Sequence, residues 1–121
     1  MRVFALRGAI SVDRNDATDI HEATVTLMRE IMQRNALGPT DVISCLFTAT
    51  DDLNGEFPAA AARTLGFEEV PLLCAREMAV PGAMPRVIRV LIHYHADEGH
   101  RARHVYLREA SALRSDLQAA Q

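Results

Sequence analysis

The chain has 121 residues, a common size for a single domain, so we expect one domain spanning residues 1–121. Hydrophobic residues make up 49% of the sequence and aromatic residues only 5%, which predicts a core built mainly from aliphatic side chains. The net charge of −3 argues against general binding to nucleic acid or anionic membranes, and no apolar run approaches the ~20 residues of a membrane span.

The first predicted element is a strand over residues 2–12, whose side chains alternate between two faces. Arg7 lies on one face between two alanines, which leave space beside its guanidinium. It is either an edge-strand residue that reaches solvent or part of a ligand site. Gly8 next to it would let another chain or molecule approach the backbone.

A helix is predicted next, with Asp16 or Thr18 at its start and Gly38-Pro39 at its end. The strand that follows, residues 41–50, is apolar on both faces, which favours an interior place in the sheet. Pro58 suits the first turn of a second helix, which runs to Gly66. Three further strands are predicted over residues 70–77, 85–95 and 104–107. This order predicts an α+β fold in which a mixed β-sheet packs against helices.

Two charged residues interrupt the apolar strands between Leu72 and Tyr94. Arg89 lies within the fourth strand, where both faces look buried, and Glu77 ends the third. A buried charge costs several kcal/mol unless a group of opposite charge meets it. A structural ion pair would explain Arg89, and a solvated strand end would explain Glu77. The functional alternative is that both contact a ligand.

All 13 basic residues are Arg, which reflects either codon bias or a need to grip planar anions through two parallel hydrogen bonds. Tyr106 in the last strand is either half-buried core or a ligand contact. Together, arginines, one carboxylate and one tyrosine on strands suit the binding and polarisation of a small anionic molecule.

Other kinds of chemistry lack support in the sequence. Cys45 and Cys74 fit reduced thiols of a cytoplasmic protein, and Cys74 has no activating base that would make it a nucleophile. His93 and His95 share a strand face without a third ligand, so we expect no metal site. Arg7 interrupts the apolar N-terminus, which is therefore not expected to be a signal peptide. Phosphate-loop, dinucleotide-binding and Ser-His-Asp patterns are also lacking.

Four stretches occur in an order typical of one enzyme family: "LRGAISVDRND", "LFTATDDLNGEFPAAAAR", "VPLLCAREMAVPGAMPRVIRVL" and "RHVYLREASALRSDL". Over residues 2–117 the chain closely resembles the AroH-class monofunctional chorismate mutases. The resemblance implies a cytoplasmic enzyme that rearranges chorismate to prephenate, on the route to phenylalanine and tyrosine, without cofactor or metal. It also implies a homotrimer in which mixed sheets form a barrel-like core with helices outside, and in which active sites lie between subunits.

The resemblance also assigns roles to residues of one subunit. Arg89 would be the cation at the ether oxygen of the substrate, and Glu77 would accept a hydrogen bond from the ring hydroxyl. Arg7 and Tyr106 would bind the carboxylate of the enolpyruvyl side chain. Cys74 would line the pocket beside the hydroxyl.

The neighbouring subunit would supply the remaining contacts, which are Phe57, Arg63, Arg114, Leu73 and Ala59. Two positions depart from the family pattern: Ala60 stands where some members have Lys, and Ser115 replaces a proline of the tail. Two competing interpretations are a catalytically idle trimer that binds a small carboxylate, and a structural trimer held by a salt bridge between Glu77 and Arg89.

Overall fold

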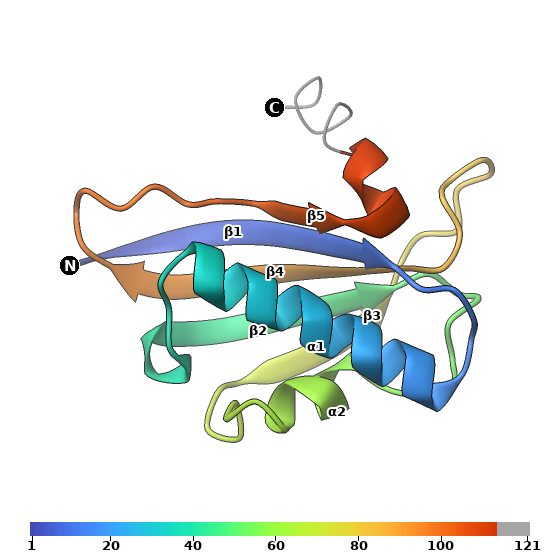
Figure 1. Cartoon of the computed structure of the whole chain (residues 1–121), viewed down its shortest axis with the longest axis horizontal. Helices are drawn as coiled ribbons and strands as arrows, with labels where there is room; N and C mark the ends of the chain where they lie inside the picture. Colours follow the sequence, from blue (N-terminus) through green and yellow to red (C-terminus); the bar gives the residue numbers. More distant parts are fainter. Residues whose placement is uncertain (114–121) are drawn as a thin grey trace.

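A mixed five-stranded sheet organises the part of the chain that the computed structural model describes, residues 1–113 (Figure 1). Its strands are β1 (Arg2–Ser11), β2 (Val42–Ala49), β3 (Leu72–Arg76), β4 (Val87–Ala96) and β5 (Val105–Leu107). They lie in the order β3-β2-β4-β1-β5. The middle strand β4 pairs antiparallel with β1 and β2, while the outer pairs β1–β5 and β2–β3 are parallel. The predicted α+β class and mixed sheet are confirmed.

Two α-helices, α1 (Ala17–Arg34) and α2 (Pro58–Arg63), pack on the same face of this sheet (Figure 1). The start of α1 matches the prediction, because the Asp16 side chain accepts a hydrogen bond from the Asp19 N–H at 2.8 Å. Its end is earlier than predicted. Asn35 caps the last turn and Ala36 adopts a positive φ of 53°, so Gly38 instead precedes a short 3₁₀ helix, Pro39–Asp41.

Helix α1 approaches the sheet closely over Gly8. A Cβ at this position would lie 2.7 Å from the Ile31 Cδ1 atom and 3.3 Å from the Leu27 Cδ1 atom, both on α1. The expected close approach at Gly8 is therefore made by a helix of the same chain. Around this contact, aliphatic side chains from the sheet and from α1 form the main core, which includes Leu6, Ile10, Leu27, Ile31, Ile88 and Ile92.

We call the opposite side of the sheet the open face, because no α-helix within residues 1–113 packs on it. Strand alternation places every second side chain there. Leu73 is 60% exposed and Leu46 is 36% exposed, although both lie on strands. A 3₁₀ helix, Arg108–Ala112, covers only one end of this face, where Tyr106 packs with Ala9. The open face carries Ala5, Arg7, Ala9, Ser44, Leu46, Thr48, Leu73, Ala75, Arg89, Leu91 and His93.

Cys45 lies in the main core, and its burial raises the pKa of its thiol from 9.0 to about 12. The unfolded chain therefore loses this proton near pH 9 while the folded chain keeps it, so rising pH favours unfolding. We expect the free energy of unfolding to fall between pH 9 and 12 by up to about 1.4 kcal/mol per pH unit. Denaturant titrations at several alkaline pH values measure this slope.

The chain is well suited to this measurement because it contains no Lys. Burial also raises the pKa of Tyr94, which adds a decline of the same sign at higher pH. Cys45→Ala should flatten the dependence just above pH 9, whereas the control variant Cys74→Ser should keep it. An unchanged slope in Cys45→Ala would show that this thiol does not govern alkaline stability.

Neither α-helix in residues 1–113 combines the length and the apolar character that crossing a bilayer requires. Both helices instead pack on the sheet (Figure 1).

Candidate functional site

An ion pair between Arg89 and Glu77 lies on the open face. Arg89 projects from the middle strand β4, and Glu77 directly follows β3, where its N–H donates to the Ala49 carbonyl at 3.0 Å. The two side chains are 38% and 15% exposed, respectively. The pair therefore neutralises both charges. Because a guanidinium has five N–H donors, Arg89 retains donors for a ligand.

The expectation that both faces of the fourth strand are buried is correct for only one face. Ile88, Val90 and Ile92 are buried under the helices. On the face that carries Arg89, Leu91 and His93 further along β4 remain partly exposed in the single chain, whereas Val87 before it is buried. Arg89 is thus accessible to a small molecule from the open face.

Arg7 and Tyr106 lie on the same face as the ion pair. Ala9 on β1 pairs with Arg89 on one side and with Tyr106 on the other, and Arg7 is two residues along the same strand. Arg7 is partly buried and pairs with Leu91 of β4, while the pairing of β1 with β5 begins only at Gly8, so the edge-strand explanation for Arg7 stays open. Tyr106 is buried against Ala9 and Ala110. Two arginines, a carboxylate and a phenol therefore share one surface of the sheet.

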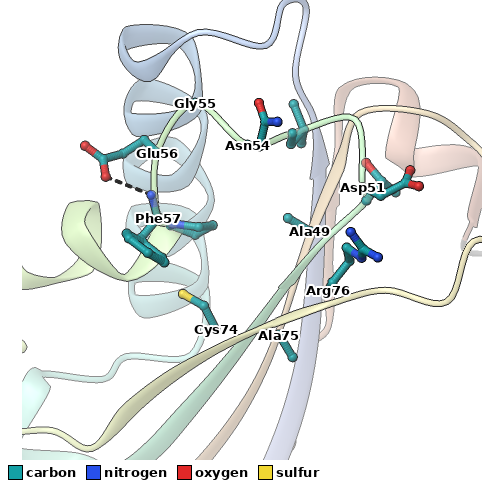
Figure 2. A pocket seen from close by; sticks show the side chains of 12 residues that line it. Ala49, Asp51, Asn54, Gly55, Glu56, Phe57, Cys74, Ala75 and Arg76 are labelled. Carbon is teal, nitrogen blue, oxygen red and sulfur yellow. Dashed lines mark hydrogen bonds between the residues drawn. The ribbon is translucent and has the colours of Figure 1, made fainter.

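A second feature is a pocket of about 500 Å³ between β3 and the loop that leads into α2 (Figure 2). Phe57 stands at its edge, 69% exposed, while its N–H donates to the Glu56 carboxylate at 2.8 Å. The Cys74 sulfur points toward Phe57 in Figure 2. Cys74 pairs with Phe47, whose side chain is buried on the helix side of the sheet. The Cys74 side of the pocket thus lies opposite the ion pair, and the pocket reaches Ala75 at the edge strand β3.

The structure separates the remaining predicted site residues. Leu73 lies on the open face and is in register with Arg7 across the intervening strands β2 and β4. Arg63 is exposed in the last turn of α2, and Ala59 is buried in the same helix. Arg114 lies outside the described residues. One chain therefore brings Arg7, Glu77, Arg89 and Tyr106 to one surface, and Phe57 and Cys74 to another.

Metal ligation has no candidate among residues 1–113, since no three His, Cys, Asp or Glu side chains gather closely enough to hold an ion. His93, one of the two histidines considered above, has its Nδ1 atom 3.2 Å from the Ser44 hydroxyl. Both cysteines are free thiols.

Two residues near these features escaped the sequence analysis. Thr48 donates a hydrogen bond from its hydroxyl to Glu77 Oε2 at 2.7 Å. Arg76 lines the Phe57 pocket from the end of β3 (Figure 2). Thr48 looked like an ordinary strand threonine, and only the pairing of β2 with β3 and β4 brings it beside the two charges. Arg76 directly precedes Glu77 in the sequence, but no sequence pattern marked it as a candidate site residue.

Comparison with known proteins gives a consistent result. The family model described as chorismate mutase type I matches residues 3–117. The protein named chorismate mutase AroH from Thermus thermophilus is 47% identical over 121 aligned residues, which cover 98% of this chain and 99% of that protein. The Bacillus subtilis (strain 168) protein of the same name is 39% identical over 119 residues, covering 97% and 94%, respectively.

A solved structure resembles the fold as well. The chorismate mutase from Clostridium thermocellum superposes with a TM-score of 0.88 at 40% sequence identity, covering 91% of this chain and 99% of that one. Residues 3–117, which the family model matches, contain both helices and nearly the whole sheet, and therefore both the open face and the Phe57 pocket.

Proposed function

The chain belongs to the type I chorismate mutases and converts chorismate to prephenate, and we propose that it does so by electrostatic stabilisation centred on Arg89 and Glu77. It is an isomerase of aromatic amino acid biosynthesis. The ion pair on an accessible sheet face is the observation on which the proposed mechanism depends.

The reaction is an intramolecular Claisen rearrangement, in which an ether C–O bond breaks while a C–C bond forms. No proton transfer and no nucleophile are needed. In the transition state the ether oxygen gains negative charge and the ring gains positive charge. A catalyst must therefore hold the folded conformer of the substrate and present a fixed cation to that oxygen.

Arg89 is the proposed cation. It projects from the middle strand of the sheet, so its backbone is held on both sides by neighbouring strands. Its guanidinium is partly shielded from water, which strengthens its interaction with a developing negative charge. Glu77 is proposed to accept a hydrogen bond from the ring hydroxyl and to face the positive side of the separated charge.

Arg7 and Tyr106 are proposed to bind the carboxylate of the enolpyruvyl side chain. Both occupy the open face next to the Ala9–Arg89 pair, from strand β1 and from its neighbour β5. Arg7 suits this role because its guanidinium can hold a carboxylate with two parallel hydrogen bonds. The small side chains of Ala5 and Ala9 leave room for the ligand beside it.

We propose that the enzyme is a homotrimer with a barrel-like core formed by the open faces, and with active sites between subunits. Apolar side chains such as Leu46 and Leu73 are left exposed on the open face, which a second subunit would bury. The Phe57 pocket of one chain lies behind the sheet that carries its own Arg89, so these groups would surround one small molecule only across a subunit boundary.

The neighbouring subunit is therefore proposed to supply the walls of the site. Its contacts would be Phe57, Ala59, Arg63 and Leu73. We propose that Cys74 joins this set, contrary to the assignment implied by the resemblance, because it faces the side of its own sheet opposite to Arg89. Arg114 is proposed to approach the second carboxylate or the entrance of the cleft. We further propose that residues 1–121 act as one domain, and that the enzyme is cytoplasmic, a location with which its two free thiols agree.

The mechanism predicts a rate that changes little with pH around neutrality. No group has to transfer a proton in the chemical step, so no acid and base pair should limit it. The measurement mixes enzyme with saturating chorismate at several pH values and follows chorismate absorbance and prephenate formation. A steep bell-shaped dependence of kcat would contradict the mechanism, although not the family assignment.

A further inference from the structure

We propose that Thr48 is a positioning residue that orients Glu77, and through it Arg89, for the rearrangement. This inference rests on the proposed roles of Glu77 and Arg89. Thr48 would not contact the reacting atoms. It would instead hold the carboxylate so that Arg89 remains directed toward the substrate.

The sheet register places Thr48 between the two charged residues. On β2 it pairs with Arg89 of β4 on one side and with Ala75 of β3 on the other. Ala75 is two residues before Glu77, so the side chains of Thr48, Arg89 and Glu77 all extend from the open face. The Thr48 hydroxyl donates to Glu77 Oε2 at 2.7 Å, while Arg89 Nη1 donates to Oε1. Each carboxylate oxygen therefore has its own donor.

Glu77 is fixed at three points. Its N–H donates to the Ala49 carbonyl at 3.0 Å, which continues the β2–β3 ladder beyond the last residue of β3. The two side-chain contacts then fix the plane of the carboxylate. Two oxygens offer about four lone-pair positions, of which these donors use two. The carboxylate can thus accept a further hydrogen bond from a ligand hydroxyl without losing either contact.

By donating to Oε2, Thr48 also leaves only Oε1 of Glu77 bound to Arg89. Arg guanidinium groups readily bind carboxylates through two parallel hydrogen bonds. If Oε2 lost the hydroxyl, Glu77 would be free to turn both oxygens toward Arg89 and occupy a second N–H donor. Arg89 would then have fewer donors directed at the substrate. Threonine suits this task, because its branched side chain has few rotamers and its strand lies inside the sheet.

The test is Thr48→Val, which keeps the shape of the side chain and removes the hydroxyl. Hydrogen bonds to charged groups are strong enough that we expect kcat to fall about 10-fold or more, with a smaller change in KM. Thr48→Ser, which retains a hydroxyl, should restore most of the activity. Thr26→Val on α1 is the matched control and should behave like the unmodified enzyme.

A second measurement separates positioning from a general loss of structure. Because Thr48 acts through Glu77, Thr48→Val should change kcat less than about twofold in a Glu77→Ala background. Equal fold-losses in both backgrounds, unchanged kcat in the single variant, or no recovery in Thr48→Ser would each overturn the inference. If Thr48→Val unfolds, Thr48→Ala takes its place in the same cycle. If Glu77→Ala alone keeps full activity, the proposed mechanism fails before Thr48 is tested.

Discussion

Arg89→Ala should lower kcat for the rearrangement of chorismate by on the order of 10²–10³-fold, the usual effect of removing one preorganised donor from a developing oxyanion. The ether oxygen would then meet water or a neutral side chain in place of a fixed charge. The fold should survive, because the Arg89 side chain is 38% exposed and water can occupy the space that it leaves. Steady-state kinetics and a thermal unfolding curve measure the two effects.

Two further variants test this interpretation of Arg89. Arg89→Lys keeps a positive charge but lacks the planar group, so its activity should lie between those of Arg89→Ala and the unmodified enzyme. Arg29→Ala, on the exposed surface of α1, removes the same charge elsewhere and should leave kcat unchanged. If Arg89→Ala kept its turnover but lost its oligomeric state, Arg89 would serve only as half of a structural ion pair.

Two inactive variants should restore each other's activity when they share a trimer. Arg89→Ala damages the half of the site on the open face, and Phe57→Asp places a carboxylate in the other half, where it would repel the dianionic substrate. At an effective dielectric constant of 20, like charges about 4 Å apart cost about 4 kcal/mol, so we expect a loss on the order of 10²-fold or more. Phe57 is 69% exposed, so the fold should tolerate this change.

Co-expression of the two chains should produce some sites that take both intact halves from different subunits. With random assembly, about one quarter of the sites would be intact, and activity should approach that fraction of the unmodified value. The matched control combines Arg89→Ala with Glu77→Ala. Both changes lie on the open face of one chain, so mixing should restore nothing. Activity no greater than the sum of the separate variants in the first mixture would contradict a site shared between subunits.

The order of strands and helices follows from local patterns, which explains why the sequence predicts it well. Alternation placed Arg7 and Ala9 on one face of β1, and the Asp16 side chain marked the start of α1. The end of α1 depends on a distant contact. Asn35 donates to the Arg103 carbonyl at 3.0 Å and accepts from the Arg103 N–H at 2.8 Å, a partner that no local pattern reveals.

The candidate site could be predicted only in part, for the same reason. The charges of Arg89 and Glu77 stand out in apolar strands, and a resemblance to a family gave them roles. The contact of Thr48 with Glu77 depends on the register of three strands, which the sequence does not specify. Similarly, the sequence does not reveal that β5 pairs with β1 only from Gly8 onward, which leaves Arg7 just outside the paired segment.

The pairing of β1 has a consequence for how the protein is made. This strand is translated before the other four strands, yet in the described chain its partners are β4 and β5, which are translated long afterwards. Such non-local pairing slows folding, because a long loop must close before the contacts form. In a nascent chain that ends before residue 87, β4 is missing, so β1 is not joined to the β2–β3 pair. The strand that joins them is the one that carries Arg89, so the same stretch of translation links the sheet and supplies the proposed catalytic cation.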